Sequence, residues 1–161
     1  PELTPDKIPV SIPGCAEPVI REYPIQISGH DQQEYSITCV SMGNPHGIVY
    51  VDDVQQIDIE KIGPLFENHP WFPERINTEF IHVDDRKNIR MRVWERGSGE
   101  TLACGTGACA SAVACVINGL TDNEITVHLL GGDLQICYDQ EKNTVYMTGP
   151  AETVCTGEIE I

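Results

Sequence analysis

The chain has 161 residues, a length that suits a single domain with a substantial core. Acidic side chains outnumber basic ones by 25 to 10, which gives a formal net charge of −15 at pH 7. Nucleic acids and anionic membranes attract clusters of Lys and Arg, so this balance argues against both as partners.

The cysteines indicate a reducing compartment. Their number is odd, their spacing is irregular, and no basic segment followed by an apolar run opens the chain as a secretory signal would. We therefore expect reduced thiols and a cytoplasmic location. A metal site is not expected, because neither C-x-x-C nor H-x-x-x-H occurs. The cysteines are Cys15, Cys39, Cys104, Cys109, Cys115, Cys137 and Cys155.

Short stretches in which apolar and polar residues alternate predict that β-strands make up most of the chain. They are rich in Ile, Val, Thr and Tyr, and turn-forming residues separate them. In chain order, the predicted strands are residues 19–27, 34–41, 47–51, 76–84, 89–94, 125–130, 134–138, 144–148 and 153–161. Gly131 and Gly132 predict a hairpin turn between the sixth and seventh strands, because glycine readily adopts positive φ.

Two helices are predicted among these strands. The first covers residues 58–67, and the second covers residues 104–118, with Gly119 as its C-terminal cap. No residue between positions 101 and 121 is charged, which raises the question of a membrane span. The segment is rich in Ala, Gly and Ser and only weakly hydrophobic, so a buried helix fits better.

The second helix carries small or apolar residues on every side, so it has to be covered on every side. Nine short strands are available to cover it. We therefore predict an α+β fold in which a curved, mostly antiparallel sheet or barrel wraps around this central apolar helix. The end of the helix that carries Cys104 is then expected to open at one mouth of the barrel.

Cys104 stands directly before Gly-Thr-Gly at the predicted start of this helix. A helix N-terminus offers unpaired N–H groups and the positive end of the helix dipole, and Gly105 and Gly107 let an anion approach that backbone. The same field favours a thiolate, so we expect the pKa of Cys104 to lie below its usual ~8.5. The segment also matches the G-x-G-x-x-A dinucleotide fingerprint, but no β-α-β unit surrounds it.

Two further polar groups lie near this segment in the sequence. Glu95 and Arg96 end a predicted strand before the turn at 97–99, where they either reach the helix mouth or form a surface ion pair. His46 lies in the turn-forming sequence G-N-P-H-G at 43–47, where it is either a titratable base or a structural residue.

Three motifs, in the order in which they occur, resemble the C-terminal half of the diaminopimelate epimerase family. They are G-N-P-H (43–46), R-I-N-T-E-F (75–80) and W-E-R-G-S-G-E-T-x-A-C-G-T-G-A-C-A (94–110). The resemblance implies an isomerase of two similar lobes that needs no pyridoxal phosphate or other cofactor. Its reaction would convert LL- into meso-diaminopimelate for lysine and peptidoglycan biosynthesis. A cysteine at the helix start of each lobe would act as a base or an acid on opposite faces of the α-carbon.

Transferred residue by residue, the resemblance assigns a role to each matching position. Cys104 would be the acid/base of this lobe, and the N–H groups of Gly105 and Thr106 would hold the α-carboxylate. Glu95 would lie near Cys104 and the α-ammonium group, and His46 would partner the cysteine of the other lobe. Three residues would recognise the distal carboxylate and amine of the substrate: Asn44, Asn77 and Arg96.

The sequence departs from the family pattern in one respect. The family's first cysteine belongs to a C-G-N-G-type motif, and neither Cys15 nor Cys39 stands before a glycine-opened helix. We therefore predict that residues 1–161 are a C-terminal lobe without its N-terminal partner, and that this chain alone is inactive. The final predicted strand, 153–161, is expected to belong with that partner lobe.

The expected partners are a small-molecule substrate and the missing lobe, and a homodimer is left open. Two other functions fit the same residues. One is a proline racemase-like or hydroxyproline epimerase-like enzyme, because such enzymes also place C-G-T-G at a helix start. The other is a non-catalytic module that binds small anions, for which Cys104 would be dispensable.

Overall fold

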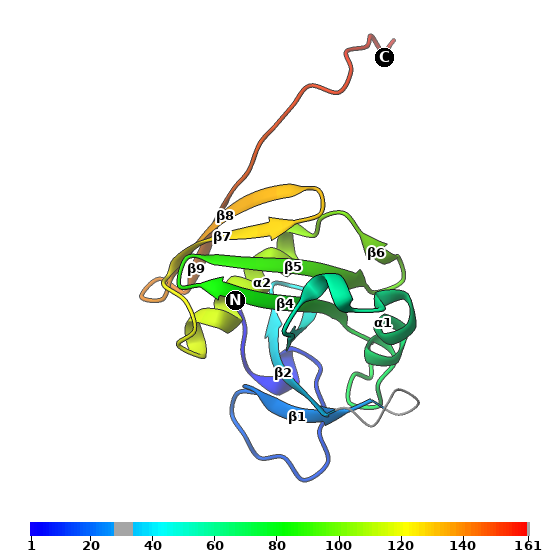
Figure 1. The fold of residues 1–161 in the computed structure, drawn as a ribbon, viewed down its shortest axis with the longest axis vertical. Helices are drawn as coiled ribbons and strands as arrows, with labels where there is room; N and C mark the ends of the chain where they lie inside the picture. Colours follow the sequence, from blue (N-terminus) through cyan, green and yellow to red (C-terminus); the bar gives the residue numbers. More distant parts are fainter. Residues whose placement is uncertain (28–33, 161) are drawn as a thin grey trace.

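The computed structural model describes residues 1–27 and 34–160. Within them, nine strands form one curved mixed sheet, shown in Figure 1. They are β1 (Tyr23–Gln26), β2 (Glu34–Ser41), β3 (Pro45–Tyr50), β4 (Asn77–Asp85), β5 (Asn88–Glu95), β6 (Gly99–Thr101), β7 (Glu124–Leu129), β8 (Gly132–Asp139) and β9 (Thr144–Thr148).

The strands follow the order β1-β2-β3-β4-β5-β7-β8-β9, and β6 pairs with the remaining part of β5. Two neighbouring pairs, β3–β4 and β5–β7, are parallel, and the others are antiparallel. The predicted α+β class with a mostly antiparallel sheet is therefore confirmed.

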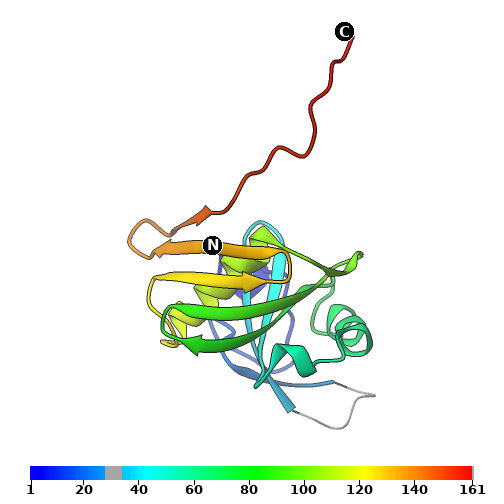
Figure 2. The same ribbon diagram turned by 45° about the horizontal axis from the view of Figure 1, so that its top comes forward.

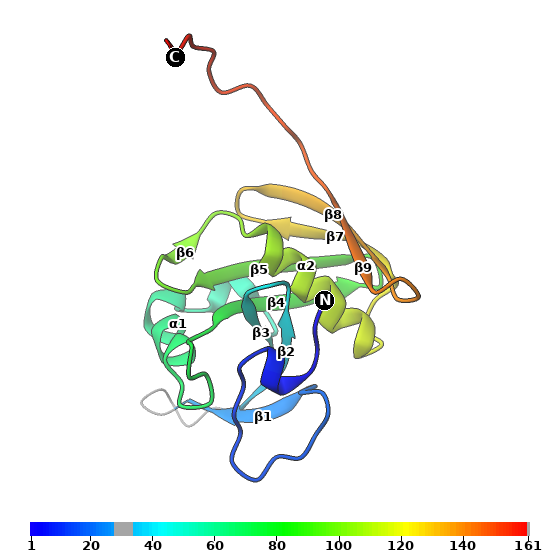
Figure 3. The same ribbon diagram turned by 180° about the vertical axis from the view of Figure 1, so that it is seen from behind.

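Helix α2 (Gly105–Ile117) lies inside the curve of the sheet, as Figure 3 shows from behind. It contacts β2 near one end of the sheet and β9 at the other, so the sheet curls around it. Every residue from 107 to 115 is buried, and most are Ala or Cys, whose small side chains let the strands approach closely. The helix ends at Asn118, and Gly119 follows with φ of 72°.

Helix α1 (Ile59–Glu67) covers the opposite face of the central strands (Figure 2). Successive residues of β2 alternate between the two cores: Val40 packs with α2, whereas Cys39 packs with α1. In the same way, Ile81 of β4 faces α2 and Phe80 faces α1. The central strands thus contribute side chains to a core on each of their two faces.

The structure corrects several predicted boundaries. The first strand covers only Tyr23–Gln26, and β6 replaces part of the turn predicted at 97–99. The hairpin turn between β7 and β8 consists of Leu130 and Gly131, because Leu129 pairs with Gly132 and Gly132 already belongs to β8. Pairing between neighbouring strands decides these limits, and the local pattern does not show it.

Two 3-10 turns, Pro5–Lys7 and Val54–Gln56, complete the regular elements of the described residues. The strand predicted at 153–161 is wrong for residues 153–160, which pair with no strand of the described chain; residue 161 lies outside the described residues. Residues 149–160 instead extend away from the body of the molecule (Figure 1). Val154 in this segment is 96% exposed.

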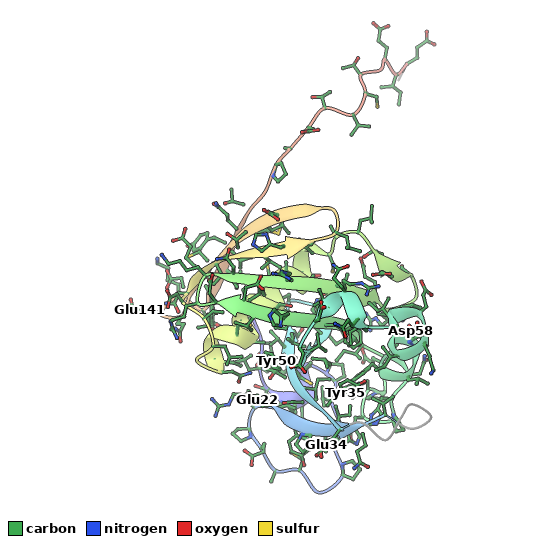
Figure 4. All side chains as sticks on the ribbon, viewed as in Figure 1. Glu22, Glu34, Tyr35, Tyr50, Asp58 and Glu141 are labelled. Atoms are coloured by element: carbon green, nitrogen blue, oxygen red, sulfur yellow. The ribbon has the colours of Figure 1, made fainter. Side chains whose placement is uncertain are left out.

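Glu34, Asp58 and Glu141, three of the acidic residues labelled in Figure 4, lie at widely separated places on the molecule. None of the helices in the described part of the chain is long and apolar enough to cross a membrane.

Candidate active site

Cys104 is the N-cap residue of α2, and its side chain is turned back over the first turn of the helix. Its sulfur accepts a hydrogen bond from the backbone N–H of Gly107 at 3.3 Å, and it lies 3.6 Å from Oγ1 of Thr106. The residue is only 8% exposed. The predicted position of the thiol at the start of the central helix is thus confirmed.

The predicted direction of the Cys104 pKa is wrong. Burial of the sulfur is the largest cause, and it raises the pKa of Cys104 above the ordinary thiol value. The negative charges of Glu79 and Glu95 raise the pKa further, while the hydrogen bonds from Thr106 and Gly107 lower it in part. Burial in this lobe therefore favours the neutral thiol over the thiolate.

His46 does not lie on the turn where the sequence placed it. Strand β3 begins at Pro45, and the parallel pairing of His46 with Asn77 draws the imidazole into the interior, where it is 0% exposed. The turn between β2 and β3 is made instead by residues 42–44, with φ of 97° at Gly43. Both ring nitrogens have partners: Nδ1 lies 2.7 Å from Oε1 of Glu79, and Nε2 lies 3.1 Å from Oδ1 of Asn44.

Glu79 is the site residue that the sequence analysis did not single out. It is the third residue of β4, in a motif quoted only for the family resemblance, and its side chain is completely buried. The available signal was a carboxylate directly before the apolar pair Phe80 and Ile81 in a predicted strand, because charged residues are rarely buried unless they are paired.

The predicted residues of the first and third motifs meet at the mouth of α2. Nδ2 of Asn44 donates a hydrogen bond to Oγ1 of Thr106 at 3.4 Å, and Thr106 is the neighbour of the Cys104 sulfur. A continuous chain of contacts therefore links the buried His46 to the thiol through one amide and one hydroxyl group.

The remaining predicted residues form a second group beside the first. The carboxylate of Glu95 accepts a hydrogen bond from the hydroxyl group of Thr101, and the Arg96 guanidinium donates to the carbonyl of Glu74 at 2.8 Å. The side chain of Asn77 links the start of β3 to the residue that follows β5. It donates a hydrogen bond to the carbonyl of Pro45 and accepts one from the backbone N–H of Arg96. Glu95 and Arg96 form no ion pair with each other within the described chain. Of these two residues, Glu95 is the one whose charge affects the pKa of Cys104.

The first turn of α2 leaves two backbone donors without a partner. Among the described residues, nothing accepts from the N–H groups of Gly105 and Thr106, and Thr106 is exposed. A small anion can therefore bind at these two groups. Gly107 serves a different purpose from the one predicted, since the side of its Cα where a side chain would project is filled by the Glu79 carboxylate and the Cys104 sulfur.

The described residues contain no cluster of three or more His, Cys, Asp or Glu side chains that could hold a metal ion. What the site offers is a neutral thiol, a pair of backbone donors beside it, and two carboxylates that disfavour negative charge on the sulfur. This arrangement can bind a carboxylate next to a sulfur that is ready to donate a proton.

The fold defines a class of protein. It is shared with a hydroxyproline epimerase from Agrobacterium vitis, whose crystal structure contains trans-4-hydroxy-L-proline. The TM-score is 0.54, and the likeness covers 73% of this chain and 40% of that protein at 13% sequence identity. At such low identity the comparison shows the fold alone.

Sequence comparisons identify the family. The family model for diaminopimelate epimerase matches residues 38–154. The diaminopimelate epimerase of Acetivibrio thermocellus is 53% identical over 161 residues, which are all of this chain and 55% of that protein. The enzyme of the same name from Agathobacter rectalis is 60% identical over 129 residues, or 80% of this chain and 45% of that protein. The chain belongs to the diaminopimelate epimerase family, a family of isomerases, and it spans about half the length of the curated relatives it matches.

Proposed function

We propose that this chain is the C-terminal lobe of a two-lobe, cofactor-independent enzyme that interconverts LL- and meso-diaminopimelate, with Cys104 as one of two acid/base residues. The observation that carries the proposal is the buried thiol of Cys104 at the N-cap of α2, beside the free N–H groups of Gly105 and Thr106. This arrangement occurs in a chain that belongs to the diaminopimelate epimerase family.

Inversion at the α-carbon requires a base on one face and an acid on the other. Burial favours the thiol form of Cys104 in this lobe, so Cys104 suits the acid role first: its S–H bond breaks, the proton joins the α-carbon, and the sulfur becomes a thiolate. A cysteine thiolate of the second lobe would take the original α-proton and become the thiol. The reverse reaction exchanges the two roles, and the proton count is unchanged.

The polar residues around Cys104 would bind the amino acid. The α-carboxylate would accept hydrogen bonds from the N–H groups of Gly105 and Thr106, where negative charge that builds up on deprotonation is stabilised. Glu95 would face the α-ammonium group. Recognition of the distal carboxylate and amine is assigned to Asn44, Asn77 and Arg96.

His46 would partner the cysteine of the other lobe, as the family resemblance implies. Within this lobe its side chain is buried, and its ring nitrogens lie 2.7 Å from Oε1 of Glu79 and 3.1 Å from Oδ1 of Asn44.

The rest of the proposal concerns the whole protein. The residues 149–160, which extend freely here, would pair with the N-terminal lobe, and the isolated chain would be inactive because it holds one base of two. All seven cysteines are free thiols, which fits a role in the reducing cytoplasm in lysine and peptidoglycan biosynthesis.

The test is exchange of the substrate α-proton in D₂O under reducing conditions, followed by NMR with LL- and meso-diaminopimelate. Two proteins are compared: this chain alone, and a chimaera in which this chain replaces the matching segment of the Acetivibrio thermocellus relative. We expect exchange only in the chimaera, and we expect Cys104→Ser to abolish it.

Exchange by the chain alone would contradict the half-site proposal. Exchange of proline but not of diaminopimelate by the chimaera would favour a proline racemase-like enzyme. Binding of diaminopimelate that Cys104→Ser leaves intact, without exchange of either amino acid, would indicate an anion-binding module.

A further inference from the structure

Strand β6 has only three residues, Gly99–Thr101, and it pairs with the last part of β5 (Figure 3). The chain passes from the end of this strand to Cys104 within three residues. So short a strand, paired on one side, is held only weakly by its backbone hydrogen bonds. Its position therefore depends on what its side chains contact.

Glu100 fixes β6 from the side of the sheet that faces α1. It lies opposite Trp94 and accepts a hydrogen bond from Nε of Arg92 at 2.7 Å, and the Arg92 and Glu100 side chains are only 15% and 21% exposed. Nη1 of Arg92 also donates to the carbonyls of Val54 and Ile57, at 2.9 Å each. Because the guanidinium group is held by all three acceptors, β6 has one position against β5.

The next residue of β6, Thr101, faces the opposite side of the sheet, toward α2. Thr101 pairs with Val93, which belongs to the core around α2, and alternate residues of a strand point the same way. Glu95 therefore lies on this face as well, and its direct partner across the strands is Gly99, which has no side chain. The Glu95 side chain meets its neighbour diagonally, at Thr101.

The Thr101 hydroxyl group donates a hydrogen bond to Oε1 of the Glu95 carboxylate. A second acceptor, the carbonyl of Ala103, lies at 3.5 Å, which is at the limit for a hydrogen bond. A hydroxyl group has a single hydrogen to donate, so the nearer carboxylate receives it. Within the described residues, the other oxygen of Glu95, Oε2, accepts no hydrogen bond and is available to a donor from outside.

Glu95 lies near both the thiol and the free backbone donors. Burial is the largest cause of the raised pKa of Cys104, and the charge of Glu95 also contributes, so this carboxylate is close to the sulfur. The free N–H groups of Gly105 and Thr106 directly follow Cys104 in α2. An amino acid whose α-carboxylate binds these groups carries its α-ammonium group on the next carbon atom, where a nearby carboxylate can accept from it.

From this geometry we infer that Thr101 is a positioning residue: its hydroxyl group fixes one oxygen of the Glu95 carboxylate and so presents the other oxygen to the α-ammonium group of the substrate. The inference rests on the proposed function, which supplies the amino acid. Without the hydroxyl group the carboxylate can turn about its side-chain bonds, and the substrate loses an acceptor that is oriented before it binds. Thr101 itself acts only through Glu95.

The test compares Thr101→Val and Thr101→Ser with the parent sequence in the chimaera described above. Valine keeps the shape of threonine and favours strands, so β6 is expected to form, but the hydroxyl group is gone. For Thr101→Val we expect KM for LL-diaminopimelate to rise at least fivefold and kcat to fall less than twofold, because the ammonium group is bound before the reaction as well as during it. For Thr101→Ser, which keeps the hydroxyl group, we expect KM within twofold of the parent.

A second measurement does not depend on activity. In ¹³C spectra of glutamate-labelled protein at constant pH, with the Glu95 carboxyl signal assigned by its loss in Glu95→Gln, we expect this signal to move in Thr101→Val and to stay in place in Thr101→Ser. The matched control is Thr126→Val on β7. Thr126 pairs with Asn88, at the opposite end of β5 from Glu95. This variant is expected to keep kcat and KM within twofold and to leave the Glu95 signal unchanged.

The outcomes separate this inference from the proposed function. In an active chimaera, a KM within twofold of the parent in Thr101→Val, or an equal rise of KM in Thr101→Ser, would overturn the inference and leave the proposed function intact. If the parent chimaera exchanges no α-proton, the proposed function fails. The Glu95 signal then decides the placement alone: movement in Thr101→Val supports it, and an unchanged signal overturns it.

Discussion

Gly107 shows how a single residue serves the site from the inside. In the sequence it belongs to a glycine-rich segment that predicts close approach of a ligand, yet its Cα faces the buried carboxylate of Glu79 rather than the cleft. Its backbone N–H group also takes part in the site, because it donates a hydrogen bond to the sulfur of Cys104. The two glycines of Cys-Gly-Thr-Gly therefore have different roles: Gly107 faces the buried Glu79, whereas Gly105 lies on the outer side of the helix.

We expect Gly107→Ala to destabilise the protein even though alanine favours helix more than glycine does. The added methyl group would lie 2.6 Å from Oε1 of Glu79, and a buried carboxylate cannot move aside freely. The expected loss in the free energy of unfolding is roughly 1–3 kcal/mol, measured by urea denaturation.

Gly105→Ala, two residues earlier in α2, is the matched control. Its new Cβ would meet the sulfur of Met147 at 3.2 Å, and this exposed, flexible side chain can shift. Equal stability losses in the two variants would contradict the steric role assigned to Gly107.

At the scale of the elements, helix α1 fixes the C-terminal end of β5, where Glu95 and Arg96 lie. Glu67, in the last turn of α1, accepts hydrogen bonds from Nε1 of Trp94 at 2.7 Å and from the backbone N–H of Gly97 at 3.0 Å. It also pairs with Arg75 at 2.8 Å. The helix thus ties together strand β5, the turn that follows it, and the loop before β4.

Replacement of Glu67 by alanine is expected to lower the free energy of unfolding by about 1–3 kcal/mol, because a partly buried indole N–H and a backbone N–H lose their acceptor together. The fluorescence of Trp94 is expected to shift to longer wavelength as water reaches the indole. The control is Glu60→Ala, on the exposed side of the same helix, for which we expect almost no change in stability. A comparable loss in both variants would refute the tie between α1 and β5.

At the scale of the whole molecule, burial in the two cores disfavours the ionisation of three thiols besides Cys104. Burial raises the pKa of Cys39 and of Cys115 to about 12, and that of Cys109 to about 11, with burial the largest cause in each case. In the unfolded chain these thiols ionise near pH ~8.5. Their contribution to stability is therefore complete below that pH and is lost as the pH rises from there toward 11–12.

We expect the free energy of unfolding to fall by about 1 kcal/mol for each buried thiol between pH 8 and pH 9.5. Urea denaturation under reducing conditions measures the fall. Cys39→Ala is expected to make the fall smaller, whereas Cys155→Ala, in the exposed segment, is expected to leave it unchanged. A stability that is constant over this pH range would contradict the prediction.

Local patterns in the sequence were sufficient for most of the central elements and for the position of the thiol, but not for β6 or for residues 153–160. Period-two alternation marks the central strands to within one or two residues, and the uncharged stretch of small residues requires a helix that is covered on all sides. Cys104 at the start of that helix, and the three ordered motifs that lead to the family, could likewise be read from the residues alone.

Only the tertiary structure decided what surrounds the thiol. His46 and Glu79 are 33 positions apart, and they meet because β3 and β4 pair in parallel, a register that no local pattern displays. The direction of the Cys104 pKa likewise depends on how completely the sheet removes water from the sulfur and on which carboxylates it brings near. Desolvation and charge proximity are properties of the packed chain, so a motif can locate the thiol, but only the fold determines the direction in which its pKa is shifted.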